Sequence, residues 1–177
     1  MADRPIPKPF AAIAKNAYRT HATATAYVED PGGAWSCDNV RLYVEGTPEL
    51  PPKYAGIIPS APPVLWAIDT PLLSFLKLCA KVKTGGKRSS TYPLRLNEHY
   101  ELRGGGHFDN VAAAHFDRKP PISLPDDMGV NPAYLLDALK FVVGGKPGNV
   151  SIAYAGGKSQ IAIRNGDRLV VVMPMFT

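Results

Sequence analysis

Five basic residues fall close together in the chain and could contact phosphate groups. They are Lys77, Lys81, Lys83, Lys87 and Arg88. Lys77 and Lys81 are four residues apart, so in a helix they share one face. Lysine and arginine bind a nucleic-acid backbone through charge, without reading base sequence. The segment predicts either backbone contact or a solvated basic surface, and the sequence leaves both open.

Two His-Phe-Asp triplets begin at His107 and His115. Imidazole and carboxylate groups are zinc ligands, but a zinc site needs three or four of them. No third and fourth ligand follow either triplet at short spacing. We therefore predict no metal site and no cofactor.

No group of residues has the composition of a catalytic site. Gly104-Gly105-Gly106 could form an oxyanion loop, but no Gly-x-Ser-x-Gly nucleophile motif accompanies it. Cys37 has no neighbouring base, and Cys79 falls in a helical pattern as a small apolar residue. Asp126-Asp127 lies in a proline-flanked turn. These observations favour a binding or structural protein over an enzyme.

The composition is that of an ordinary globular protein. The chain has 177 residues, 45% hydrophobic and 20% charged, with a net charge of +5. These values exclude wholesale disorder and allow an anionic partner. The longest apolar run, around Leu169–Met173, is far shorter than a membrane span of ~20 residues. We expect a soluble, cytoplasmic protein with no membrane contact.

Proline divides the chain into two parts. Six prolines fall between residues 47 and 63, a density that excludes a central strand or a helix interior. We interpret this stretch as an extended linker. It separates an N-terminal segment, 1–62 with the linker included, from a body, 63–177. The N-terminal segment has a helical pattern over 10–19 and strand patterns over 23–28 and 40–44.

The body contains one order of elements twice: a strand, a helix and three strands. Proline at the first helical position and glycine after the last residue bound both helices, 71–83 and 132–143. The predicted strands are 64–68, 90–96, 99–103, 110–116, 122–124, 149–155, 159–164 and 168–175. This order predicts an α+β fold, a duplicated unit with two antiparallel sheets and both helices on one side.

The C-terminal third resembles a known family. The segments are Asn131-Pro132-Ala133-Tyr134-Leu135-Leu136-Asp137-Ala138-Leu139-Lys140, then Asn149-Val150-Ser151-Ile152, then Val171-Val172-Met173-Pro174-Met175. Their order and spacing resemble the end of the bacterial DNA polymerase III beta subunit, the sliding clamp. The specific match covers 131–177. Residues 63–130 agree with one DNA-clamp-like domain in element order, and 1–47 could be a degenerate half unit.

The resemblance implies a non-enzymatic processivity factor or related accessory for DNA replication, of phage or mobile-element origin. Clamp domains form a ring around double-stranded DNA with helices lining the hole, so Lys140 of the second helix joins the DNA-binding candidates. The chain has about half a clamp subunit's length, so a six-domain ring needs a homo-oligomer of four or six chains. Val172, Met173, Pro174 and Met175 correspond to one wall of the clamp's pocket for polymerase peptides.

The resemblance also leaves alternatives open. The pocket's other wall in the family includes a Thr-Asp-Gly-His-Arg-Leu segment, and we identify no such segment here. Some residue types of that segment recur in Asn165-Gly166-Asp167-Arg168-Leu169, but these residues lie on the wrong side of the strand pair to form the other wall. The chain could instead be a clamp mimic or adaptor that binds replication proteins without encircling DNA. A fortuitous match, with the chain an enzyme or a virion structural protein, is the third reading.

Overall fold

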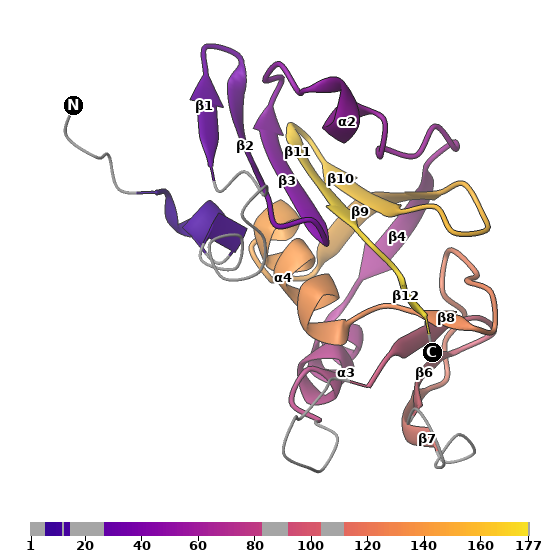
Figure 1. Ribbon diagram of the computed structural model, residues 1–177. Helices are drawn as coiled ribbons and strands as arrows, with labels where there is room; N and C mark the ends of the chain where they lie inside the picture. The colour runs from indigo at the N-terminus through magenta and orange to yellow at the C-terminus, as the bar shows by residue number, and fades with distance from the viewer. Residues whose placement is uncertain (1–5, 12, 15–26, 83–91, 104–111, 177) are drawn as a thin grey trace, which may run out of the picture.

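The computed structural model describes residues 6–11, 13–14, 27–82, 92–103 and 112–176. The larger of its sheets has seven strands, all paired antiparallel (Figure 1). In spatial order they are β1 (Val28–Asp30), β2 (Gly33–Cys37), β3 (Arg41–Gly46), β11 (Arg168–Val172), β10 (Ile161–Asn165), β9 (Gly148–Tyr154) and β4 (Val64–Ile68). The pairing of β3 with β11 places residues 28–46 and the C-terminal hairpins in one sheet.

Three further strands form a second antiparallel sheet. They are β5 (Leu94–Leu96), β6 (Tyr100–Arg103) and β7 (Ala112–Phe116). A two-stranded ribbon pairs β8 (Met128–Gly129) with β12 (Met175–Phe176). A single bridge between Leu94 and Val130 connects the segment after β8 to β5.

The two long helices begin at their predicted caps, and the second ends where predicted, but the first ends at Cys79, four residues before the predicted end at residue 83. Asp69 accepts a hydrogen bond from the Leu72 amide (3.0 Å) at the start of α3 (Thr70–Cys79). Asn131 accepts one from the Ala133 amide (2.9 Å) at the start of α4 (Pro132–Val143). Gly144 ends α4 with φ 67°, a conformation that glycine adopts at little cost. Residues 8–11 and 13–14 are also helical.

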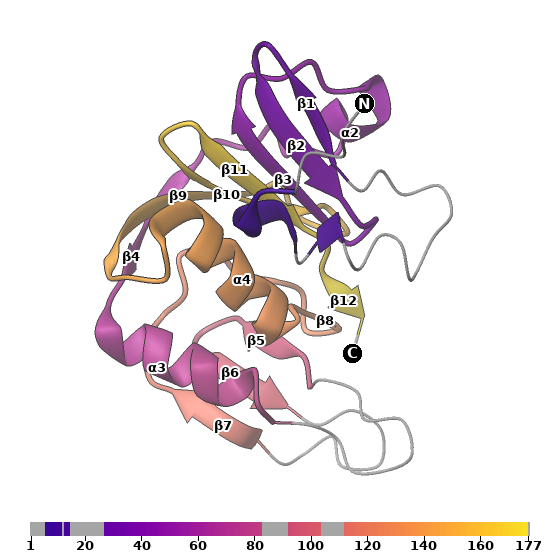
Figure 2. The same cartoon turned by 90° about the vertical axis from the view of Figure 1, so that its left-hand side faces the viewer.

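Both long helices lie on one side of the sheets, as predicted. α4 packs against β9, β10 and β11, and α3 packs against α4 and β7 (Figure 2). The main hydrophobic core fills the space between helices and sheets and includes Leu76, Leu139 and Val170. Phe10 and Ile13 of the N-terminal helical residues belong to this same core. The fold is therefore α+β with two antiparallel sheets.

A second hydrophobic cluster covers the opposite face of the large sheet. Strand alternation produces it: Val170 and Val172 face the helices, while Leu169 and Val171 face outward. The proline-rich segment packs on this outer face through Tyr54, which is 5% exposed. The prolines predict an extended linker here, and that prediction is wrong in part, because the segment contains the short helix α2 (Pro52–Ala55). Pro52 stands at the first helical position, where its missing amide costs nothing.

Other boundaries differ from the predicted ones for local reasons. Residues 122–124 form no strand, although the Leu124 amide donates to the Leu96 carbonyl (2.7 Å). The final predicted strand divides into β11 and β12 around Pro174, which cannot donate to a strand ladder. The predicted strand over 23–28 lies largely outside the described residues. None of the described helices is long and apolar enough to span a membrane.

Candidate functional site

A small apolar cavity of about 150 Å³ opens on the outer face of the large sheet. One wall comes from Val171 and Met173 at the end of β11. The rest of the lining comes from the turn between β2 and β3 with the start of β3, where Leu42 pairs with Val171 and the Met173 amide donates to the Val40 carbonyl (2.9 Å), and from α2, which packs over this face. The lining residues are Cys37, Asn39, Val40, Arg41, Leu42, Lys53, Tyr54, Ile57, Val171 and Met173. A cavity of ~150 Å³ is large enough for benzene, so it can accept a large apolar side chain.

The β2–β3 turn is held by one buried carboxylate. Asp38 Oδ1 accepts hydrogen bonds from the backbone amides of Val40 (3.1 Å) and Arg41 (2.7 Å). Between them Asn39 adopts φ 68°, in the left-handed region that asparagine tolerates better than most residues. The turn therefore has a defined shape that places Val40 beside the cavity.

Arg41 connects this turn to α4. Its Nη2 and Nε atoms donate to Asp38 Oδ2 at 2.8 and 3.1 Å, and its Nη1 donates to Asp137 Oδ2 at 3.4 Å. Its guanidinium also stacks over the Tyr134 ring, 4.2 Å from the centroid. Burial lowers the pKa of Arg41, but the Asp38 charge and hydrogen bonds outweigh burial and raise it overall. The guanidinium stays charged and fixes one cavity wall against α4.

The α2 wall is built on an aromatic contact. Tyr54 packs on Trp35 of β2, with ring centroids 4.9 Å apart. Lys53 places its ammonium 4.5 Å from the Tyr54 ring centroid. The proline-rich segment thus contributes a positioned aromatic residue and a positive charge to the rim.

The four predicted residues of the C-terminal strand have different environments. Met173 lines the cavity and is partly buried. Val172 is completely buried in the helix-side core and does not line the cavity. Pro174 is partly buried, and Met175 pairs with Gly129 in the ribbon. Val171, not among the predicted residues, takes the place beside Met173.

The second wall was missed at the sequence level. Cys37-Asp38-Asn39-Val40-Arg41-Leu42 has Asp, Arg and Leu where the clamp segment Thr-Asp-Gly-His-Arg-Leu has them. Asn39 stands at the glycine position and has a positive φ. The spacing of Asp38, Arg41 and Leu42 was the available signal, and Asn165–Leu169 was the wrong segment to compare.

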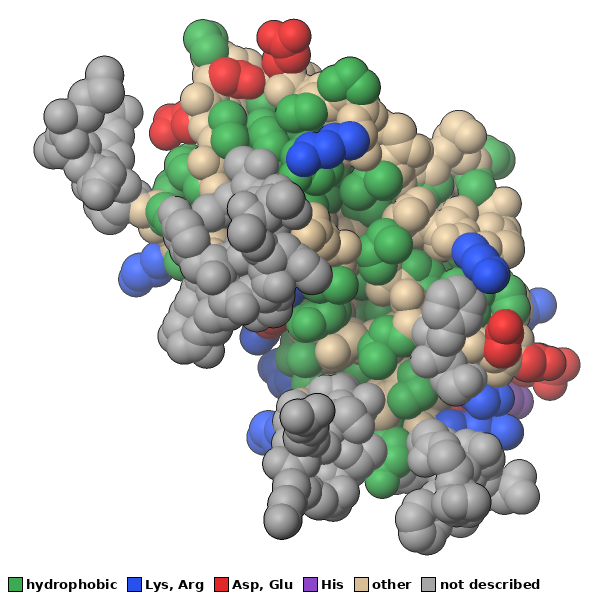
Figure 3. Space-filling view, viewed as in Figure 1, with side chains coloured by type: hydrophobic (Ala, Val, Ile, Leu, Met, Phe, Trp, Pro, Cys, Tyr) green, Lys and Arg blue, Asp and Glu red, His purple; other side chains and the backbone are tan. Residues whose placement is uncertain are grey.

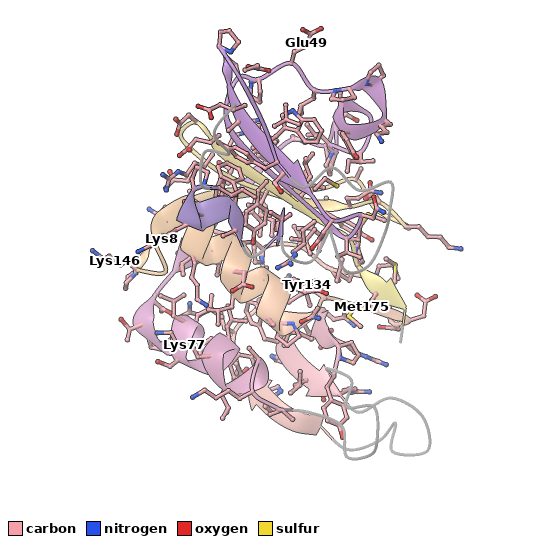
Figure 4. All side chains as sticks on the ribbon, turned by 60° about the vertical axis from the view of Figure 1, so that its left-hand side comes forward. Lys8, Glu49, Lys77, Tyr134, Lys146 and Met175 are labelled. Carbon is pink, nitrogen blue, oxygen red and sulfur yellow. The ribbon has the colours of Figure 1, made fainter. Side chains whose placement is uncertain are left out.

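The basic candidates lie over the helices. Lys77 of α3 and Lys81 just beyond it are exposed, while Lys83, Lys87 and Arg88 fall outside the described residues. The Lys140 side chain of α4 is 55% exposed, and its Nζ lies 3.2 Å from Asp137 Oδ1. Lys8 and Lys146 are exposed too, and Figure 4 shows them with Lys77 along one side of the molecule. Sequence reasoning missed these last two because they are distant in the chain.

The cavity and the lysines occupy opposite faces of the large sheet. The helices with their lysines cover one face, and the cavity opens on the other. The space-filling view shows hydrophobic side chains over the middle of the face presented in Figure 1 (Figure 3).

The remaining candidates show no catalytic arrangement within the described residues. Cys37 and Cys79 are buried, and burial raises both thiol pKa values, that of Cys79 to about 12. Asp126 accepts a hydrogen bond from Asn97 (2.8 Å) in an exposed turn. Gly104–Gly106 and His107 lie outside the described residues, and His115 lies on β7.

Comparison with solved structures identifies the architecture. A DNA polymerase sliding clamp from Pseudomonas aeruginosa superposes with a TM-score of 0.61 at 15% identity, over 99% of this chain and 69% of that one. A structure of the Pseudomonas aeruginosa clamp with ligand gives 0.60 at 13% identity, over 100% and 69%. No protein-family model and no curated protein matches the sequence. The resemblance to bacterial DNA polymerase III beta subunits is confirmed in three dimensions: this chain has the sliding-clamp fold.

Proposed function

We propose that this chain is a non-enzymatic, sliding-clamp-like accessory protein of DNA replication that recruits replication proteins to double-stranded DNA. The observation that carries the proposal is the two-walled cavity at Met173, on the face opposite the lysine-bearing helices. A clamp needs this separation, because DNA must pass on the helix side while partner proteins bind outside. The superposition on the Pseudomonas aeruginosa clamp supports the proposal, because the helices and sheets of the two chains have similar arrangements.

The cavity is suited to a short linear peptide. Apolar groups dominate its lining, and Lys53 and Arg41 are the charged residues at it. Ligand sites of this kind bind through apolar contact and fix orientation with a few polar groups. We infer that a large apolar side chain of a polymerase or other replication protein inserts between Met173 of the sheet and Tyr54 of α2.

Peptide binding is tested by fluorescence anisotropy. The probe is a labelled peptide carrying the clamp-binding segment of a replicative polymerase. We expect Met173→Glu to weaken binding at least tenfold, because it places a charge in an apolar cavity. Leu65→Glu, an equal charge change at a leucine of β4 that is 70% exposed and does not line the cavity, is the matched control. Equal affinities for wild type and Met173→Glu would exclude this cavity as the binding site.

Self-assembly is the second part of the proposal. Strands β1 and β7 are edge strands at opposite ends of the molecule (Figures 1 and 2). Edge strands offer unpaired backbone groups to another chain. Joining one end to the opposite end of the next copy is a head-to-tail contact, which forms rings when the rotation closes. Near β7, Phe75 stacks on Phe116 (5.3 Å), and Leu78, one helical turn further, is 56% exposed.

Light scattering across protein concentrations tests assembly. We expect a tetramer or hexamer that Leu78→Glu dissociates. Asn149→Glu introduces the same charge at an exposed position of β9, an interior strand of the large sheet, and serves as control. Retention on circular but not linear DNA at ~0.5 M salt, where backbone contacts are weak, would establish encirclement. Equal loss from both DNAs would exclude a closed ring.

The adaptor alternative rests on one observation: both cavity walls come from a single chain. Partner binding therefore requires no ring. A chain that stays monomeric at every concentration and still binds the polymerase peptide through Met173 would favour an adaptor over a clamp.

A further inference from the structure

Two histidines and one aspartate come together on the outer face of the three-stranded sheet. They are His99, His115 and Asp117, and one ligand atom from each lies within 4.8 Å of the others. His99 Nδ1 is 3.2 Å from Asp117 Oδ1, and the ring centroids of His99 and His115 are 4.9 Å apart. This cluster lies outside both the cavity and the lysine-bearing face.

The register of β6 and β7 explains the cluster. Tyr100 pairs with Phe116, and Glu101 pairs with His115. Continuing this antiparallel register by one residue brings His99 opposite Asp117. Tyr100 is completely buried and Phe116 packs against the core, so their neighbours point to the other face of the sheet. The backbone thus presents the three side chains together.

We propose that His99, His115 and Asp117 bind a divalent transition-metal ion, with Zn²⁺ as the ion to test. Imidazole nitrogen and carboxylate oxygen are the ligand types that zinc takes at about 2.0–2.2 Å, which places ligand atoms roughly 3.3 Å apart in a tetrahedron. The His99–Asp117 distance already has that value. The His99 and Asp117 side chains are 44% and 86% exposed, so rotation can bring the third ligand into range.

The nearby charges leave Asp117 available for the metal. Glu101, the cross-strand neighbour of His115, is engaged by Arg103 at 2.6 Å. Asp117 has the imidazole of His99 as its ion-pair partner, which is itself a ligand. Three protein ligands leave at least one coordination position for water or a donor from another molecule. The site does not depend on the proposed clamp function.

Zinc competition against a chromophoric chelator tests the site on the metal-free full chain. We expect one Zn²⁺ per chain, with affinity reduced at least tenfold in His115→Ala and in Asp117→Asn. Asp127→Asn removes the same charge from another exposed aspartate and should bind as wild type. All three substituted positions are exposed, so loss of the fold is not expected.

Three results would overturn the proposal. One is wild-type protein that leaves Zn²⁺ with the chelator. Another is unchanged affinity in both ligand variants. The third is loss of binding in a Cys37→Ser, Cys79→Ser double variant with the histidines intact, which would assign the metal to the thiols.

Discussion

The guanidinium of Arg41 and the carboxylate of Asp38 form a buried ion pair at 2.8 Å, with both side chains nearly free of solvent contact. Three residues apart, they close the β2–β3 turn on itself. The same guanidinium reaches Asp137 and Tyr134 of α4, on the far side of the sheet. The cavity lining formed by this turn is thereby tied to the helix layer through Arg41.

Arg41→Ala should destabilise the protein strongly. The substitution leaves the Asp38 carboxylate buried without its cation, a change that costs about 3–5 kcal/mol in comparable pairs. Arg103→Ala removes an ion pair with Glu101 that is partly exposed, and such pairs contribute about 0–1 kcal/mol. Urea denaturation of both variants measures the difference. Equal losses would show that the Asp38–Arg41 pair has no special structural role.

Asn39 allows a second, independent test of the turn. Its φ of 68° disfavours residues with a Cβ, at a cost of roughly 1–2 kcal/mol. Asn39→Gly should keep or slightly raise stability, whereas Asn39→Val should lower the free energy of unfolding by about that amount. Asn149→Ala, at an exposed position of β9, is the control and should change little. A stable Asn39→Val variant would contradict the left-handed conformation.

The sequence predicts the elements whose ends are set by neighbouring residues. Asn131 and Pro132 mark the start of α4 and Gly144 marks its end, and the structure places the helix between these residues. Asn165-Gly166 predicts the β10–β11 hairpin in the same way. The pairing of β3 with β11 joins residues more than a hundred positions apart, such as Glu45 and Arg168. No local pattern contains that information.

The same distinction applies to the candidate sites: residues in a contiguous pattern were predicted, and residues that only the fold brings together were missed. Met173 was predicted because it falls in a contiguous, family-like pentapeptide. The β2–β3 turn was missed because only Asp38, Arg41 and Leu42 of its six residues resemble the family segment. His99 was missed for a topological reason, since the hairpin register and not chain spacing brings it to His115 and Asp117.

DNA contact through the helix face should appear in the salt dependence of binding. Each lysine that neutralises a phosphate contributes about 1 to the slope of log affinity against log salt. Lys77→Ala and Lys81→Ala should each lower the slope by about that amount without changing sequence preference. Lys53→Ala, on the cavity side, is the matched control and should leave the slope unchanged. A reduced slope for Lys53→Ala alone would place DNA on the opposite face.

Asp69 should make stability depend on acid pH. The hydrogen bond from Arg118, and then that from the Leu72 amide, lower the pKa of this helix-capping carboxyl below 3.8. A lowered pKa in the folded state means that the contribution is present above about pH 3.8. It is lost as the pH falls through the folded-state pKa.

Asp69→Asn separates this charge from helix capping, because asparagine caps helices about as well as aspartate. At pH 7 the variant should unfold at lower urea concentration than wild type. The gap should shrink as the pH falls below 3.8. Urea denaturation at several pH values measures the difference in midpoint between wild type and Asp69→Asn. A difference that grows in acid would contradict a lowered pKa of Asp69 in the folded state.

Val172 and Met173 are neighbours whose substitutions should have opposite consequences. Val172 is fully buried on the helix side, so Val172→Ala should lower the free energy of unfolding by about 1.5–3 kcal/mol through lost burial and cavity formation. Peptide affinity should remain, because the Val172 side chain points away from the cavity.

Met173→Ala should cost under about 1 kcal/mol of stability, since Met173 is only partly buried. It should weaken peptide binding about tenfold, because it removes the side chain that forms one wall. Urea denaturation and anisotropy on the same two proteins separate the effects, and the reverse pattern would require the strand to present Val172 to the peptide.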